Sequence, residues 1–192
     1  MKKRIISFMT AILLIVSAMA CCTAETAPEL PTYTDEATGI RFVIPEGWEQ
    51  QPLSQERQFL KMKMLPPGDS SKSIMFGYQD AWAQVPAATL TASGIKTRKD
   101  LDAIYMQPDM LAGASGADAK DIVFEEHGGY TFGVFTITNT QYGITLKMTV
   151  ATTCINGYLI MFQLISDGDN EALKPALDAV LDSFVWDAEI PD

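Results

Sequence analysis

The sequence predicts an α+β fold, in which helices cover an antiparallel sheet, and three observations support this. The second half of the chain contains four strand-like runs in succession, residues 121–126, 130–138, 144–154 and 158–165. Short segments with glycine join them: His127-Gly128-Gly129, Gln141-Tyr142-Gly143 and Asn156-Gly157. Because these connections are too short for parallel crossovers, the runs are predicted to form a four-strand antiparallel meander. A helical pattern follows at residues 170–184 and should pack across the meander.

The last strand and the last helix of this pattern have distinct signatures. Residues 158–165 are apolar at nearly every position, which predicts a central strand covered on both faces. Asp169 or Asn170 is expected to cap the helix. The buried stripe of the helix is expected to consist of Leu173, Leu177, Val180, Leu181 and Phe184.

The first half of the chain contains shorter strand-like segments. Alternation of apolar and polar residues is found at residues 40–44, 59–65 and 74–78. The first of these could pair as a hairpin with the extended pieces that begin at Tyr33 and Trp48. In the second, Lys61 and Lys63 alternate with apolar residues, which suits a solvent-facing or edge strand.

A helix is predicted to begin just after Thr97. Thr97 and Asp100 resemble a capping box, with aspartate in place of the usual glutamate. An apolar stripe that includes Tyr105 follows at helical spacing. Pro108 should end or kink this helix. Residues 111–120 are rich in alanine and glycine and are interpreted as a mobile loop.

The composition of the 192 residues fits a globular protein, with 47% hydrophobic and 20% charged residues. The formal net charge of -10 repels nucleic acid, so no nucleic-acid partner is expected. Of the three cysteines, Cys21 and Cys22 lie near the start of the chain, which excludes a disulfide scaffold. Cys154 lies in an apolar run and is expected to be a small buried hydrophobic residue. The sequence indicates no cofactor.

The start of the chain has the pattern of a secretory leader. Residues 1–20 combine a basic segment, an apolar segment and Ala18-Met19-Ala20, an A-x-A cleavage pattern. Cys21 follows directly, as in a bacterial lipobox, although Ala18 stands where lipoboxes prefer leucine. Lipidation of Cys21 would anchor the protein to the membrane, and free secretion is the alternative. We therefore expect a tether at residues 21–31, one domain at residues 32–188 and a tail at residues 189–192.

Three short signatures resemble the PsbP-like family. They are Tyr33-Thr34-Asp35 running into Gly39-Ile40-Arg41-Phe42, then Pro45-Glu46-Gly47-Trp48, which matches the family's P-x-G-W, and finally Leu177 to Phe184, a closing helix that ends in Ser-Phe. The resemblance spans about residues 32–188 and implies a PsbP-like α/β/α sandwich. Several bacterial members of the family are small exported lipoproteins of the cell envelope, which agrees with Cys21. The resemblance implies no shared catalytic motif, and nothing in this chain points to the photosynthetic role of other members.

Motifs for catalysis are weak. Ser93 and Lys96 fit S-x-x-K, a pattern in which the lysine lies one helical turn from the serine and activates it. The partner motifs S-D-N and K-T-G are absent, as are G-x-S-x-G and the P-loop. His127 is the only histidine, lies beside two glycines and is interpreted as an exposed turn residue. No catalytic residue is assigned, and a hydrolase with an unrecognised site remains an alternative.

A second alternative is a divalent-cation site. Asp167 and Asp169 belong to an acidic loop whose oxygens could contribute to a calcium site. The same residues are also typical of a capped helix start.

The preferred hypothesis is a non-catalytic protein of the cell envelope that binds a protein partner or a small ligand. The aromatic residues Trp82, Tyr78 and Tyr105 are candidates for the binding surface. Core packing of these rings is the competing interpretation. The expected location is the outer face of the cytoplasmic membrane or the cell envelope, or the medium if the protein is secreted freely.

Overall fold

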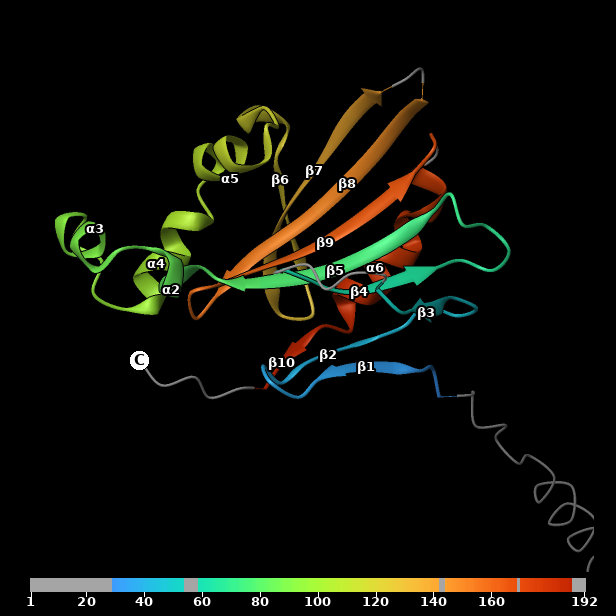
Figure 1. Cartoon of the computed structure of the whole chain (residues 1–192), viewed down its shortest axis with the longest axis horizontal. Coiled ribbons are helices and arrows are strands. Elements are labelled where there is room, and N and C mark those ends of the chain that lie inside the picture. Colours follow the sequence, from blue (N-terminus) through green and yellow to red (C-terminus); the bar gives the residue numbers. More distant parts are fainter. Residues whose placement is uncertain (1–28, 54–58, 142–143, 169, 188–192) are drawn as a thin grey trace, which may run out of the picture.

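The main sheet is antiparallel throughout and runs diagonally across the molecule (Figure 1). The computed structural model describes residues 29–53, 59–141, 144–168 and 170–187. Within these residues the sheet has seven strands. In spatial order they are β3 (Glu49–Gln51), β4 (Leu60–Leu65), β5 (Ser73–Asp80), β9 (Tyr158–Ser166), β8 (Ile144–Ile155), β7 (Tyr130–Gln141) and β6 (Val123–His127).

The predicted meander is present as the successive hairpins β6–β7, β7–β8 and β8–β9. The last hairpin turns at Asn156 and Gly157, which both have positive φ, at 49° and 72°. This is the turn that an Asn-Gly pair favours, because its twist matches that of the two strands. The strand β9 is central, with β5 on one side and β8 on the other.

A smaller sheet lies below the main one and joins the two ends of the described chain. It consists of β1 (Thr32–Asp35), β2 (Ile40–Val43) and β10 (Val185–Trp186), with β2 in the middle. The first two strands form a hairpin. The extended piece after Trp48 becomes β3 and pairs with β4 in the main sheet, so its expected pairing with residues 40–44 is wrong.

One face of the main sheet carries the principal core. Alternate residues of the central strands, including Phe76 and Phe162, point to this face and are fully buried. The helix α6 (Lys174–Asp182) packs on it with Leu177, Val180 and Leu181, as the predicted stripe requires. The small sheet contributes Ile40 and Phe42 to the same core.

The predicted cap of this helix is not formed by Asn170. A short 3₁₀ turn, η2 (Glu171–Leu173), precedes α6, and Asn170 makes no side-chain capping bond to it. Instead, the buried Asn170 amide donates to Thr149 Oγ1 at 2.8 Å, and its oxygen accepts from Ser166 Oγ at 2.5 Å. The side chain therefore ties the helix start to β8 and β9. Asp169, the other predicted cap, lies outside the described residues.

Helices from the middle of the chain gather at one end of the opposite sheet face (Figure 1). They are α2 (Ala81–Gln84), α3 (Ala87–Ala92), α4 (Arg98–Tyr105), α5 (Pro108–Ser115) and the 3₁₀ turn η1 (Ala119–Asp121). The capping box of Thr97 and Asp100 starts α4 as predicted. The loop expected at residues 111–120 is wrong as far as Ser115, because Pro108 begins a new helix, α5, after the previous helix has ended. Among the described residues, no helix has the length and apolar character needed to cross a membrane.

Candidate ligand-binding site

The second face of the main sheet, which we call the open face, is apolar but only partly covered. Residues paired across antiparallel strands point to the same face. Phe135 of β7 pairs with Val150 of β8, which pairs with Gln163 of β9. Met161, two residues before Gln163, lies on this face as well and is half-buried. The prediction that β9 is covered on both faces is therefore met only in part.

The helices α4 and α5 cover one end of the open face. Leu111 of α5 is buried in a small cluster with Ile122, Phe135 and Val150. A glycine makes this close approach possible, because a Cβ atom on Gly133 would lie 2.7 Å from the Leu111 side chain. The helix pair, which we call the roof, thus lies over β7 and β8. In the described part of the chain, no helix covers the rest of the open face.

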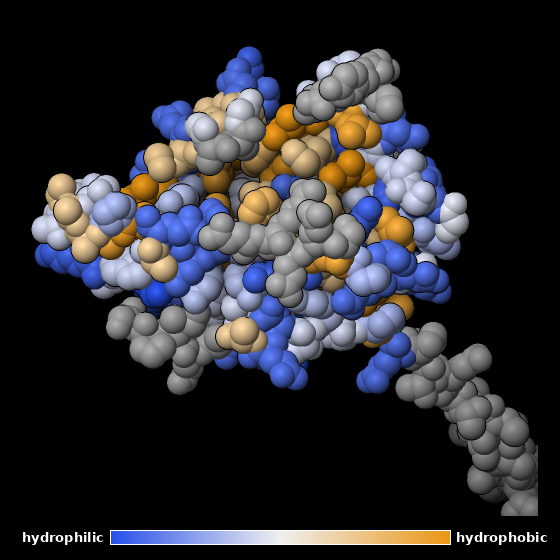
Figure 2. All heavy atoms as spheres, in the orientation of Figure 1, coloured by the Kyte–Doolittle hydropathy of each residue, from blue (hydrophilic) through white to orange (hydrophobic). Residues whose placement is uncertain are grey.

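A hollow of about 230 Å³ lies between this roof and the sheet. It is lined by Tyr105, Met110, Leu111, Phe135, Ile137, Met148, Val150, Thr152, Leu159, Met161 and Gln163. Figure 2 shows apolar side chains gathered on the molecular surface over β7, β8 and β9, beside α5. Three of the lining residues are methionines, whose flexible side chains adapt to ligands of different shape.

A smaller hollow of about 140 Å³ adjoins the first. It lies over β5 and β9, and it shares Leu159 and Met161 with the larger hollow. Phe59, which is 48% exposed, borders its far side. The two hollows together form one apolar trough across four strands, which we call the open-face trough. Its volume reaches the low end of the roughly 300–1,000 Å³ range of ligand pockets.

Few polar groups line the trough. Burial raises the pKa of the Tyr105 phenol, with a smaller contribution from Cys154. Gln163 Nε2 lies 2.8 Å from Met161 Sδ, a weak thioether acceptor. The Thr152 hydroxyl donates to the Ile160 carbonyl at 2.9 Å. The trough is therefore an apolar surface with two side-chain amides, those of Gln163 and Gln79, and in the described part of the chain the Gln163 amide has only a thioether as its hydrogen-bond partner.

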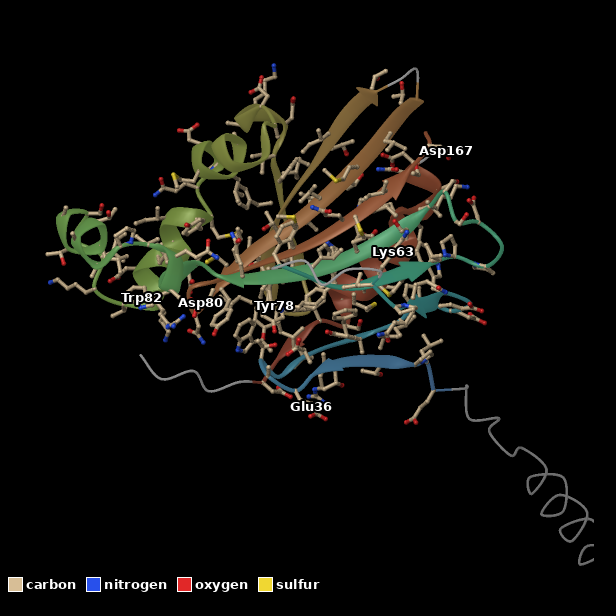
Figure 3. The ribbon with its side chains drawn as sticks, viewed as in Figure 1. Glu36, Lys63, Tyr78, Asp80, Trp82 and Asp167 are labelled. Atoms are coloured by element: carbon tan, nitrogen blue, oxygen red, sulfur yellow. The ribbon has the colours of Figure 1, made fainter. Side chains whose placement is uncertain are left out.

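Of the three predicted aromatic residues, Tyr105 lines the larger hollow, Tyr78 borders the smaller one, and Trp82 lines neither. Trp82 lies on α2, half-buried, with the Arg98 guanidinium 5.8 Å from its ring centre (Figure 3). Tyr78 packs against the principal core, and its hydroxyl donates to Asp35 at 3.1 Å. Burial, with the negative charge of Asp35, raises the pKa of Tyr78 to about 12.

Arg98 joins the region around Trp82 to the β8–β9 turn. Its Nη1 atom donates to Asp80 and to the Asn156 carbonyl, both at 3.1 Å. Nearby, Asp102 accepts from the backbone amides of Asn156 and Gly157 at 2.9 and 2.7 Å. These bonds fix α4 on the sheet and thereby position the roof of the trough.

The candidate residues for other chemistry are not brought together. Ser93 follows the end of α3, and Gly94 has a φ of 71°, so Ser93 and Lys96 do not lie on one helix as the activation geometry requires. Asp167 is exposed near the end of β9 (Figure 3), and Asp169 lies outside the described residues. Cys154 is buried, and its Sγ atom lies 3.2 Å from Asp102 Oδ1. Burial raises the pKa of its thiol, and the negative charge of Asp102 raises it further. It is a packing residue, as predicted.

The interpretation of His127 as an exposed turn residue is wrong. It ends β6, and its side chain is only 11% exposed. Its Nδ1 lies 2.7 Å from Asp182 of α6, and its Nε2 lies 3.2 Å from Glu125. Burial alone would lower the pKa of His127, but the hydrogen bonds to Asp182 and Glu125 outweigh this effect and raise it.

Glu125, His127 and Asp178 place possible metal-ligand atoms within 4.8 Å of one another. However, the Lys174 ammonium already lies 2.8 Å from Asp178 and 3.3 Å from Glu125. The carboxylates therefore have a cationic partner within the protein. We interpret the cluster as an ion-pair network that joins β6 to α6.

Sequence reasoning missed the trough because its walls come from two sources. The sheet residues belong to strands that were recognised, but β9, which carries Met161, was expected to be covered on both faces. The roof residue Leu111 lies in the segment interpreted as a loop. The signal that could have found this helix is Pro108, which favours the first position of a helix as strongly as it opposes a helix interior.

Comparison with solved structures places the fold among known proteins. A protein from Bacteroides thetaiotaomicron matches 83% of this chain with a TM-score of 0.58 and 7% identity. The match covers 49% of that protein, so this chain spans about half its length. A likeness at this identity concerns the fold alone.

A PsbP protein and a cell-envelope protein are also among the similar structures. CyanoP of Synechocystis matches 86% of this chain and 97% of its own, with 16% identity and a TM-score of 0.43. LpqN of Mycobacterium tuberculosis, which is involved in cell envelope biogenesis, matches 83% of this chain and 86% of its own, with 14% identity and a TM-score of 0.47. No protein-family model and no curated protein matches the sequence.

Proposed function

We propose that this chain is a non-catalytic binding protein of the cell envelope, and that it holds an apolar ligand in the open-face trough. The observation that carries the proposal is the trough itself. Its lining is almost wholly apolar, and half-buried residues such as Met148 and Met161 remain in contact with solvent. Removing such surface from water stabilises a complex by roughly 25 cal/mol for each Å² that is buried.

The lining also supports a role in binding rather than in catalysis. The residues that line the two hollows include no histidine, cysteine, aspartate or glutamate in the described part of the chain. Their polar groups are hydroxyls and amides, among them those of Tyr105 and Gln163. Such groups orient a ligand, but they do not form the pair of nucleophile and base that covalent catalysis requires.

The location in the cell envelope rests on the start of the sequence. Residues 1–20 have the pattern of a secretory leader, and Cys21 follows as in a lipobox. Both lie outside the described residues. An exported protein with an apolar trough fits a role in holding or presenting hydrophobic molecules at the membrane surface.

Nile red, an uncharged apolar dye whose fluorescence rises on burial, tests the proposal. The full chain, produced with its own leader, should bind the dye, and dodecanol should displace it. The variant Met161→Trp fills the region shared by the two hollows and should weaken dye binding at least tenfold. Leu146→Trp is the matched control, because Leu146 is 41% exposed on the same face of β8 and lines neither hollow.

The control variant should bind Nile red as the unaltered chain does. Equal binding by the unaltered chain and Met161→Trp, with unchanged far-UV circular dichroism, would place the dye elsewhere and would contradict the proposal. No uptake of dye by the unaltered chain would contradict it as well.

A further inference from the structure

A row of paired residues crosses the open face and ends at a lysine. Its members are successive cross-strand partners. From the roof outward they are Phe135 of β7, Val150 of β8, Gln163 of β9, Met75 of β5 and Lys63 of β4. Neighbouring strands lie about 4.8 Å apart, so the row is about 19 Å long. One end lies under α5 and is buried, whereas the other end carries a cation.

Lys63 has no acidic partner in the described part of the chain. Its neighbours across β5 and β3 are Met75 and Gln51, and no ion pair within 4 Å involves it. The side chain is half-buried and lies on β4 beside β5 (Figure 3). A cation with no counter-ion among the described residues is an available site for an anion.

Lys61, the other lysine of β4, has a different environment. A bulge between Leu60 and Met62 shifts the register of β4. Lys61 lies over the ring of Tyr78, with its Nζ atom 4.7 Å from the ring centre. Tyr78 packs on the principal core side of the sheet. Lys61 is thus engaged in a cation–π contact with a ring that borders the smaller hollow, and Lys63 is the cation at the end of the paired row.

Gln163 adds a second polar contact between the lysine and the buried end. It lies two strands from Lys63, which is about 10 Å. Its amide has only the Met161 thioether as a partner in the described residues, so its donors are available to an oxygen acceptor. The open face therefore changes along the row from apolar under α5, through an amide, to a cation.

We propose that the ligand is an anionic single-chain amphiphile, a long-chain carboxylate. Its alkyl chain lies in the open-face trough beneath α4 and α5, and its carboxylate lies near Lys63 and Gln163. This inference rests on the proposed function and adds the chemical class of the ligand. It predicts that the charge of the head group, and not only the length of the chain, sets the affinity.

Laurate and dodecanol test this inference, because they share an alkyl chain and differ in the head group. Both are titrated against Nile red bound to the full chain, below their aggregation concentrations. The unaltered chain should bind laurate about tenfold more tightly than dodecanol, the effect expected of a hydrogen bond to a charged group. Lys63→Gln should remove this preference and leave the affinity for dodecanol unchanged.

Two further variants serve as controls. Lys61→Gln removes a lysine from the same strand and should retain the preference for laurate. Lys63→Arg retains the charge and should also keep it. Dodecanol binding as tight as laurate binding, or a preference that survives in Lys63→Gln, would overturn the anionic head group and leave the proposed function standing. Failure of both ligands to displace the dye, or of the chain to bind the dye at all, would overturn both.

Discussion

His127 of β6 and Asp182 of α6 lie 55 positions apart in the sequence, yet His127 Nδ1 is 2.7 Å from Asp182 Oδ1. The imidazole of His127 also packs against the ring of Phe132 in a T-shaped arrangement, with ring centres 6.2 Å apart. Glu125 accepts from the other side of the imidazole, and Asp178 and Lys174 of α6 complete the charged surroundings. The histidine therefore fastens the closing helix to the edge strand of the sheet.

The stability of the protein should depend on the protonation of His127. Its pKa is raised in the folded state, so its charged form contributes stability that is complete below the unfolded pKa of about 6.5 and is lost as pH rises through the higher folded value. The difference between the melting temperature of the unaltered chain and that of His127→Gln should therefore decrease as the pH rises from about 6 to about 8. A difference that grows with pH in this interval would contradict the assignment of His127 as a charged partner of Asp182.

The β6–β7 turn should tolerate no side chain at Gly128. A Cβ atom there would lie 2.7 Å from the Phe184 carbonyl oxygen and 3.0 Å from that of Leu181, and the φ of 58° adds backbone strain. We expect Gly128→Ala to lower the free energy of unfolding by about 2 kcal/mol or more. Gly68→Ala is the control, because Gly68 has a φ of 73° with no neighbouring atom within 4 Å. It should cost only about 1 kcal/mol, measured by urea unfolding.

Trp82 should contribute to stability and not to binding in the trough. Its ring packs in the cluster around Leu101 and contacts the Arg98 guanidinium. Trp82→Ala should therefore lower the free energy of unfolding by about 3 kcal/mol. The same variant should bind Nile red as the unaltered chain does. Loss of dye binding at a temperature where the variant remains folded would instead support Trp82 as a binding residue.

Lipidation of Cys21 is a separate prediction that comes from the sequence alone. The chain extracted from the envelope should begin at Cys21 and carry acyl groups, which intact-mass spectrometry detects. Cys21→Ser should abolish the acyl increment and release the protein from the membrane fraction, because the anchor supplies the affinity for the bilayer. An unmodified mass for the unaltered chain would indicate free secretion.

Local patterns predicted much of the fold. Strand-like runs joined by short segments with glycine, among them Asn156-Gly157, identified the meander, because a tight hairpin turn is determined by neighbouring residues. The stripe of α6 followed from its spacing for the same reason. The helix α5 was missed because its alanines and glycine resemble a loop, and its stability depends on packing by Leu111 against the distant Gly133.

The candidate binding site was less predictable for a related reason. Tyr105 was identified by its residue type, but the trough exists because α4 and α5 cover only part of an apolar sheet face. Nothing in the local sequence of β9 distinguishes a covered face from an open one. Likewise, the environment of His127 depends on Asp182, whose proximity results from the packing of α6 on β6.

Methyl NMR of the methionines tests the central claim most directly. The chain has methionines on both faces of the sheet: Met110, Met148 and Met161 line the trough, whereas Met62 and Met64 are fully buried in the principal core. Titration with dodecanol should shift the methyl signals of the first group and leave those of the second group in place. Signals that all stay unchanged, or that shift only for Met62 and Met64, would contradict an apolar binding site on the open face.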